Sequence, residues 1–267
     1  MPTESEYSDD VDYIDEYHGR LVEMLPTVKR VLSDWCLYMN EDKTEHVHIY
    51  LAQRGDVDSN GKSVVDNEQW RSSKLLGSLL CSVKDIQHRI IMANIAFNNF
   101  SSVWSKGRKI SLQRLLRVYD AQVVSVLLYN CSSWGVPQHI IEKLDITHRK
   151  HLRSILKIKW TDKISNVKLY ALTNTTPLST RVAQSRWKLF GHILRSEENT
   201  PASTALLFAV NSQNNLSGRR GRHRINLWSV LKNDLKLRNI DINLNCIEDF
   251  YRLRDLASDR NAWYKLM

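Results

Sequence analysis

Glycine and proline are scarce in this chain, with nine glycines and five prolines among 267 residues. A fold of many short strands needs a turn about every 8–12 residues, and glycine and proline are the residues that make such turns. The scarcity therefore argues against a turn-rich all-β fold and favours long helices. The chain is long enough for a buried core and for two or more small domains.

Cysteine pairs, long apolar runs and phosphate-binding glycine loops are also missing. The four cysteines form no C-x-x-C pair, which favours free thiols of an intracellular protein, nuclear or cytoplasmic, over a disulfide framework or a zinc site. No apolar run approaches the length of a membrane span, and the acidic N-terminus is unlike a signal or transit peptide, so we expect no membrane association. Neither G-x-G-x-x-G nor G-x-x-x-x-G-K-[ST] occurs. The cysteines are Cys36, Cys81, Cys131 and Cys246.

Charge is divided unevenly along the chain, whose net charge is +9. Residues 1–83 hold 8 Lys or Arg against 16 Asp or Glu, whereas residues 84–224 hold 23 against 7. Residues 225–267 are nearly balanced, with 7 against 6. An acidic head before a strongly basic middle suggests metal chemistry beside a surface that binds a polyanion, and we favour nucleic acid. The alternative is a protein whose lysines and arginines form well-solvated faces.

Apolar residues at helical spacing dominate the chain after residue 82. An earlier helix is predicted over 16–35, where Pro26 should break it or begin its second half. A later helix should begin at Pro177, and a last helical region should cover 225–267. Between them, three apolar stripes predict helices: Ile86, Ile90, Ala93, Phe97, Phe100 and Trp104, ended by Gly107; Leu112, Leu116, Tyr119, Val123 and Val126, with Ser111 as N-cap; and Ile141, Leu144, His148, Leu152 and Ile155. The helix after Pro177 should run through Val182, Leu189 and Ile193.

Strand signals are few and lie before residue 82. His46–Leu51 has the composition of a strand, and Leu75–Leu80 predicts a second short strand in which Gly77 would let a ligand approach the backbone closely. Turn-forming residues fill 53–69 and 211–224, which we expect to be loops. The predicted fold class is therefore α+β and predominantly α-helical.

Two adjacent carboxylates near the start of the chain are the first candidate site. Asp9 and Asp10 follow Tyr7, and Val11 and Tyr13 then alternate as in a strand, so the acids would stand at the tip of a β-hairpin. Carboxylates in such a place suit Mg²⁺, which takes one or two of them and leaves its other positions to water and phosphate. The alternative is a solvated acidic turn, since residues 1–6 show no strand pattern to pair with.

The order of these segments resembles the second half of a reverse transcriptase, from the end of the palm into the thumb. It is most similar to the C-terminal half of a reverse transcriptase from a non-LTR (LINE-like) retrotransposon, and the resemblance covers nearly the whole chain. Tyr7-Ser8-Asp9-Asp10 matches the family's metal-binding Y-x-D-D hairpin, and Leu37 to Thr44, with Asn40 and Lys43, matches the motif that follows. Leu75-Leu76-Gly77-Ser78 matches the short strand pair called the primer grip.

Three later motifs continue the match. Leu127-Leu128-Tyr129-Asn130 with Trp134 resembles a thumb motif that usually reads L-L-Y-G-x-x-x-W, with Asn130 in place of the glycine. Trp187-x-x-Phe190-Gly191-His192-x-x-Arg195 and Gly218-Arg219-Arg220-Gly221-Arg222 resemble motifs beyond the thumb. The fingers, the palm strand with the first metal-binding aspartate, any endonuclease domain and the cysteine–histidine knuckle of some relatives are absent from these residues.

The resemblance implies a division of the chain and a set of catalytic residues. Residues 1–82 would be a partial palm, 83–160 a helical thumb lying along the template–primer duplex, and 161–267 a basic helical C-terminal region. Asp9 and Asp10 would bind Mg²⁺, and Lys43 would protonate the pyrophosphate leaving group. For Lys43, an exposed turn lysine without a catalytic role is the equal alternative. Leu76, Gly77 and Ser78 would form the primer grip.

Basic residues on the later segments are the candidate nucleic-acid ligands. They would hold an RNA template, a DNA primer or another nucleic acid through phosphate contacts, without reading bases. The arginine run after residue 218 can equally be a solvated loop or a nuclear-localisation signal. The candidates on the helix that contains His148 are Lys143, Lys150, Arg153 and Lys157, and those of the run are Arg219, Arg220, Arg222 and Arg224.

Histidine pairs and the apolar helix after Pro177 are read as structural. His46 with His48, and His148 with His151, lack a nearby third ligand, so we do not expect a metal there. His192, in the motif beyond the thumb, is expected to pack in the core together with the tryptophan of that motif. The function predicted by the resemblance is RNA-directed DNA polymerisation with Mg²⁺, incomplete in these residues. The alternative is a non-catalytic helical interaction protein, from a decayed element or one reused by its host.

Overall fold

The structure is a computed structural model that describes residues 3–7, 10–14, 18–45, 72–105, 110–212, 225, 227–242, 244 and 246–266. The chain divides into two compact units, residues 1–80 and 81–267. Helices make up most of the described residues, which confirms the predominantly helical prediction. None of the described helices is long and apolar enough to span a membrane. Identification of these parts as palm, thumb and C-terminal region stays a prediction.

The first unit begins with an antiparallel hairpin. Strand β1 (Thr3–Tyr7) pairs with β2 (Asp10–Ile14), from Thr3 opposite Ile14 to Tyr7 opposite Asp10. The first strand thus forms from a segment without strand patterning, because its partner and the short connection supply the pairing. Helix α1 (His18–Asp34) then runs through Pro26 without a break, which corrects the expectation of an interruption there. A proline inside a helix removes one backbone hydrogen bond and does not always end the helix.

Two short elements complete the first unit. The 3₁₀ helix η1 (Glu41–Lys43) follows α1, and the strands β3 (Lys74–Leu75) and β4 (Ser78–Leu79) form a second hairpin. Leu75–Leu80, predicted from composition as one short strand, is therefore a pair of strands. The strand predicted at 46–51 and the loop at 53–69 lie outside the described residues.

Burial is slight in the first unit. Among the side chains that the structure describes there, only Ser78 is buried. Val22 and Val31 of α1 are each nearly half exposed, and Trp35 and Tyr38 beyond its end are more than three-quarters exposed. Since the burial of apolar side chains is the main source of stability, these segments have little internal stabilisation of their own.

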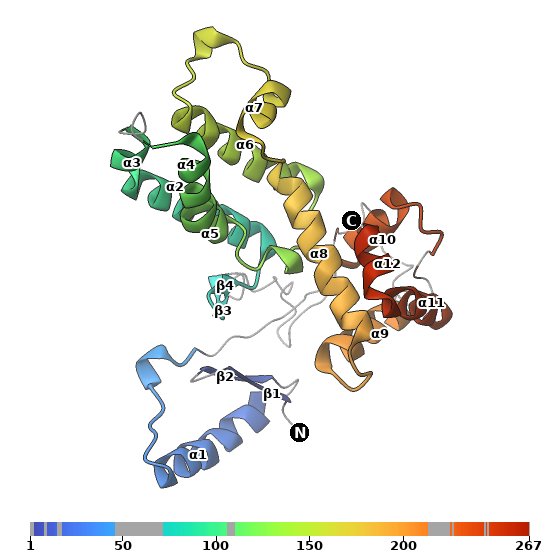
Figure 1. The fold of residues 1–267 in the computed structure, drawn as a ribbon. Coiled ribbons are helices and arrows are strands. Elements are labelled where there is room, and N and C mark those ends of the chain that lie inside the picture. Colours follow the sequence, from blue (N-terminus) through green and yellow to red (C-terminus); the bar gives the residue numbers. More distant parts are fainter. Residues whose placement is uncertain are drawn as a thin grey trace, which may run out of the picture. The chain divides into compact units, whose positions relative to one another are not determined.

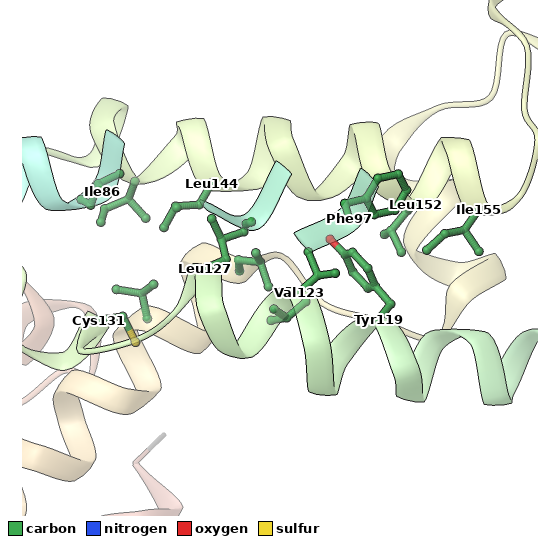
Figure 2. Close-up of a cluster of buried hydrophobic side chains, with 14 of the residues drawn as sticks. Ile86, Phe97, Tyr119, Val123, Leu127, Cys131, Leu144, Leu152 and Ile155 are labelled. Atoms are coloured by element: carbon green, nitrogen blue, oxygen red, sulfur yellow. The ribbon is translucent and has the colours of Figure 1, made fainter. Parts of the chain in front are cut away.

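The second unit holds a first hydrophobic core made by five helical segments. They are α2 (Ser82–Asn99), α3 (Ser101–Ser105), a continuous helical stretch over Leu112–Leu127, α6 (Gln138–Ile155) and α7 (Asn166–Thr173). Figure 2 shows Leu144 and Leu152 of α6 facing side chains of the other helices, with Tyr119 and Val123 below them. All five residues of the stripe predicted for α6 are buried, which confirms that prediction.

The predicted helix over 86–104 is interrupted. Helix α2 ends at Asn99, and α3 begins at Ser101. Phe100 lies between them, and its N–H donates to the Phe97 carbonyl. Trp104 nevertheless reaches the core, where its indole N–H donates to the carbonyl of Phe97 at 2.8 Å and its ring stacks on the Phe97 ring. The apolar stripe therefore correctly predicted which side chains face the core, although they lie on two helices and not on one. Gly107 lies outside the described residues.

A π-helical turn shifts the buried face of the next helix. Helix α4 (Leu112–Tyr119) continues through η4 (Asp120–Val124) into α5 (Ser125–Leu127). Buried residues recur every four positions, at Leu115, Tyr119, Val123 and Leu127. Two of them, Tyr119 and Val123, belong to the predicted stripe, whose other members are only half-buried. A spacing of four drifts around an α-helix of 3.6 residues per turn, and the wider π turn offsets that drift. Ser111 is the N-cap residue as predicted, but its side chain makes no capping hydrogen bond.

Helix α8 (Leu178–Arg195) connects the first core to a second one (Figure 1). Leu178 and Val182 near its start belong to the first core, and Trp187 and Phe190 farther along belong to the second. Helices α9 (Pro201–Ser212), α10 (Leu227–Leu237), α11 (Ile247–Ser258) and α12 (Arg260–Lys265) surround the second core. The predicted opening after Pro177 is confirmed, while α7 and α9 were not predicted.

Candidate nucleic-acid interface and catalytic segments

The hairpin β1–β2 defines where the acid pair lies. Because Tyr7 pairs with Asp10, only residues 8 and 9 connect the two strands. Asp10 is therefore the first residue of β2, next to the end of the hairpin, as the sequence predicted. Asp9 itself lies outside the described residues. Among the described residues no further strand pairs with β1 or β2, so the hairpin has two open edges there.

Lys43 is the last residue of a short capped turn. The Asn40 side chain accepts the backbone N–H of Lys43 at 3.2 Å, and the Thr44 hydroxyl donates to the Asn40 carbonyl at 2.8 Å. Lys29 of α1 bonds to Glu41 in the same turn and lowers the pKa of that carboxyl. Asn40 and Thr44 thus fix the backbone around Lys43, whose side chain is exposed. An exposed Lys43 side chain is compatible with a role in protonating a leaving group and with a turn lysine that has no catalytic role.

The proposed primer grip is a two-residue turn between β3 and β4. Leu75 pairs with Ser78, and the residues between them have positive φ values, 47° at Leu76 and 77° at Gly77. Two left-handed residues in a row are the geometry of a type I′ hairpin turn, which suits glycine and strains leucine. Leu76 is exposed at this turn while Ser78 is buried.

These three segments are described separately, because Asp9 and the side chain of Asp10 lie outside what the structure describes. The described part of the chain contains no group of three or more His, Cys, Asp or Glu side chains placed to hold a metal ion.

Asn130, which stands where the resembled thumb motif has glycine, adopts a backbone conformation that glycine favours. Asn130 has φ 55° and ψ 22°, a left-handed conformation that glycine adopts freely and that asparagine tolerates better than most residues. The turn places Trp134 in the core, where its indole N–H donates to Asp85 of α2 at 2.9 Å. Asp85 also pairs with Arg89 at 3.5 Å, and the Arg89 guanidinium lies 4.4 Å from the ring centre of Tyr129. Trp134 and Tyr129 of the motif thus connect this turn to α2.

The candidate cations of α6 differ in what they contact. Lys143 and Lys150 are exposed and lie seven residues apart, two turns along one helix face. Arg153 instead donates to the Ile164 carbonyl at 3.3 Å and to the Asn166 side chain at 2.8 Å, so it holds the segment leading to α7. Lys157 is exposed just after the helix, at φ 56°. Lys143 and Lys150 are the cations best placed to meet phosphates.

Several cations of α8 are instead paired with other groups of the second unit. Arg186 is buried against Asp234, with its Nε 2.6 Å from one carboxylate oxygen and its second nitrogen 3.1 Å from the other. Arg195 donates to the Ala257 carbonyl, and Arg181 pairs with Asp120. Part of the basic excess of residues 84–224 therefore holds the fold together and does not contribute free charge.

Two buried histidines of α6 form a directed hydrogen-bond network. His151 Nε2 lies 2.9 Å from the Asn94 side-chain oxygen, which only accepts, so this nitrogen carries the proton. His151 Nδ1 then accepts from the Tyr119 hydroxyl at 3.3 Å, and that hydroxyl accepts from His148 Nδ1–H at 3.0 Å. Burial lowers the pKa of both imidazoles to about 4, and raises that of Tyr119. The pair is a neutral core element.

One exposed aromatic residue was missed by the sequence reasoning. Trp160 begins the 3₁₀ helix η6 (Trp160–Asp162) between α6 and α7, and 88% of its surface is exposed. Lys157, Lys159 and Lys163 flank it, and the run K-x-K-W-x-x-K was the available signal. His192, expected to pack, is exposed on α8, whereas Trp187 is buried as expected.

The remaining predicted ligands are not placed by the structure. Arg219, Arg220, Arg222 and Arg224 lie outside the described residues. The described stretch from Lys150 to Lys168 holds six Lys or Arg residues against one acid, Asp162, so this stretch is the candidate nucleic-acid interface. Comparisons of the chain with protein-family models, with curated proteins and with solved structures give no match.

Proposed function

We propose that this chain is part of an RNA-directed DNA polymerase of the non-LTR retrotransposon type, which binds nucleic acid and does not extend a primer alone. In this proposal residues 1–82 are a partial palm, 83–160 the thumb and 161–267 the basic C-terminal region. The observation that carries the proposal is the hairpin β1–β2, whose two-residue connection leaves Tyr7-Ser8-Asp9-Asp10 at its end.

Two local structures add support. The turn that carries Lys43 is capped by Asn40, which belongs to the same sequence motif. Asn130, in the place of a glycine of the resembled motif, is left-handed, and this conformation is the physical reason for a glycine there. Each of these motifs thus has a backbone geometry that its residue types explain.

The lack of catalysis in the isolated chain follows from the ligands that are present. Nucleotide addition in the resembled family uses two divalent ions, which need carboxylates from more than one strand. Asp9 and Asp10 come from one hairpin, and the described residues offer no further carboxylates grouped for a metal. We therefore assign no catalytic step to this chain alone.

Binding of nucleic acid is the activity assigned to the second unit. Exposed lysines run from Lys143 and Lys150 on α6 through the loop to α7, while the counter-charge there is low, with Asp162 as the one acid between residues 146 and 196. Such cations contact phosphates, which gives affinity without base reading.

A non-catalytic interaction protein is the second candidate. The observation that favours it is a group of exposed apolar side chains on one helix, Ile91, Met92 and Ile95 of α2. Exposed apolar groups of this kind mark contacts with other proteins when they are contiguous. This candidate requires no nucleic-acid binding, so one binding experiment separates the two.

The experiment is a salt titration of binding to a fluorescent duplex. If about six cations meet phosphates, log K should fall against log salt with a slope of about −4 to −5. The variant Lys143→Glu with Lys150→Glu should flatten the slope by about one per lost contact and weaken all sequences alike. Lys265→Glu on α12 is the matched control and should keep the wild-type slope. A flat salt dependence, or no binding at micromolar protein and low salt, would favour the interaction protein.

A further inference from the structure

We propose that Trp160 and the lysines beside it form a stacking site for an unpaired base of single-stranded RNA. The inference rests on the proposed nucleic-acid function and names a site within it. Trp104, Trp134, Trp187, Trp228 and Trp263 are all buried in the second unit, where Trp160 is the exposed exception among the described tryptophans. An indole left in water is a ready contact surface.

The backbone under Trp160 is held in place. The Asp162 carboxylate accepts the backbone N–H of Lys159 at 2.7 Å, and the N–H of Asp162 donates back to the Lys159 carbonyl at 3.1 Å. Lys163 ends the turn in a left-handed conformation. The indole is thus presented from an ordered turn, which reduces the entropy lost on binding.

The return path of the loop is also anchored. Arg153 of α6 donates to the Ile164 carbonyl and to the side chain of Asn166, and the Ser165 hydroxyl accepts the N–H of Lys168 at 3.2 Å. Figure 1 shows this loop, in yellow, leading out from the end of α6 and back to α7. The site is therefore built on two helices and not on a free loop.

The positive charge around Trp160 favours a nucleic acid over a protein as the ligand. Within the described part of the chain, Lys159, Lys163 and Lys168 make no ion pair, and all three are exposed. The Asp162 carboxylate, the one acid of the loop, is occupied by its backbone bond. Protein interfaces are depleted in lysine, whereas proteins that bind single strands combine aromatic stacking with cations along the backbone. A duplex hides the faces of its bases, so the indole selects a single strand, and the transcript of the proposed function is its source.

The test compares binding of a 15-nucleotide uridine RNA, a thymidine DNA of equal length and a 15-base-pair duplex to the full chain. Trp160→Ala should weaken RNA binding by about 5- to 150-fold, the range that follows from the loss of one stacked base. Duplex binding should change less than twofold, and the salt slope should stay, because stacking releases no counterions. Trp160→Phe should restore most of the affinity. Trp35→Ala, which removes an indole 77% exposed in the other unit, is the matched control and should bind like wild type.

The outcomes separate this site from the proposed function. Wild-type binding to none of the three ligands would overturn the proposed function together with the site. Salt-dependent binding with unchanged RNA affinity in Trp160→Ala would keep the function and overturn the site. An equal loss on RNA and duplex, with an unchanged melting temperature, would also overturn stacking, and a loss on DNA alone would overturn the assignment to RNA. A loss on both single strands, with the duplex spared, supports it.

Discussion

Trp187 of α8 and Trp263 of α12 stack face to face, with ring centres 4.0 Å apart and planes within 1° of parallel. Each indole N–H donates to the backbone carbonyl of the other residue at 3.1 Å. The arrangement ties the end of the chain to the helix that joins the two cores. It is possible because Gly191 leaves room: a Cβ atom at this position would lie 2.3 Å from Nε1 of Trp263.

Gly191→Ala is therefore expected to destabilise the second unit. The Trp263 ring is buried and cannot swing away, so we expect a loss of about 1–3 kcal/mol in the free energy of unfolding, as for other overpacked cores. Urea denaturation followed by near-ultraviolet circular dichroism measures it. Gly19→Ala, where nothing lies within 4 Å of the added atom, is the control and should cost nothing. Equal stability of the two variants would contradict the contact.

The buried ion pair Arg186–Asp234 gives a second prediction. Asp234→Ala leaves the arginine charged and unpaired in the core, which should cost about 3–5 kcal/mol. Replacing both residues, with Arg186→Met and Asp234→Leu, should cost much less than the single change. Asp120→Ala removes a largely exposed partner of Arg181 and should cost less than about 1 kcal/mol. Similar costs for Asp234→Ala and Asp120→Ala in denaturant unfolding would argue against the buried pair.

The histidine network predicts acid sensitivity. The pKa of His148 and of His151 is about 4 in the folded chain, below the ordinary 6.5, because burial disfavours the charged ring. The unfolded chain then binds more protons between pH 6.5 and 4, so stability is full above pH 6.5 and falls as the pH drops. One histidine accounts for about 3 kcal/mol at most.

His148→Phe should make this pH dependence shallower. His148 Nε2 is buried and has no hydrogen-bond partner among the described residues, so a phenyl ring removes an unsatisfied group along with the titration. The measurement is urea unfolding at several values between pH 7 and pH 4. His139→Gln, a change at an exposed position of α6, should reproduce the wild-type profile. A wild-type profile in His148→Phe would show that His148 does not contribute to the acid loss.

Burial predicts a difference in local stability between the units. Amide hydrogens of β1, β2 and α1 should exchange with solvent faster than those of α6 and α8, because the first unit buries almost no apolar side chain among its described residues. Hydrogen exchange followed by mass spectrometry compares them directly. Equal protection in both units would show that the first unit is stabilised by contacts beyond those described.

The sequence predicted those helices whose apolar residues follow one simple period. The stripe of α6 is buried throughout, including His148, and the stripe of α2 and α3 points to the core despite the break at Phe100. On α8, of the apolar residues that marked the predicted helix, Val182 is buried, and Leu189 and Ile193 are half-buried. The buried face there includes Arg186 and Gly191, which a hydrophobic pattern reads as surface or as neutral.

The candidate site was predictable only in its local parts. The strand that begins at Asp10 and the turn at Lys43 follow from short-range sequence rules, and the structure shows both. The partner strand β1 has no strand pattern of its own, so the hairpin as a whole was less predictable. The loss of Arg153 and Arg186 as free cations depends on partners 11 and 48 residues away, which no local pattern reveals. The exposure of Trp160 depends on the turn that carries it, which the lysines around it do not by themselves reveal.

Primer extension on a poly(A) template with Mg²⁺ tests the central claim most directly. The reaction is run with this chain and with a reconstructed frame that adds fingers and the palm strand bearing the first metal-binding aspartate, each with and without Asp9→Ala. The account predicts no extension by the chain alone, and extension by the reconstructed frame that Asp9→Ala abolishes. Extension by the chain alone that is lost in Asp9→Ala, or a folded reconstructed frame that binds primer–template without extending it, would contradict the account.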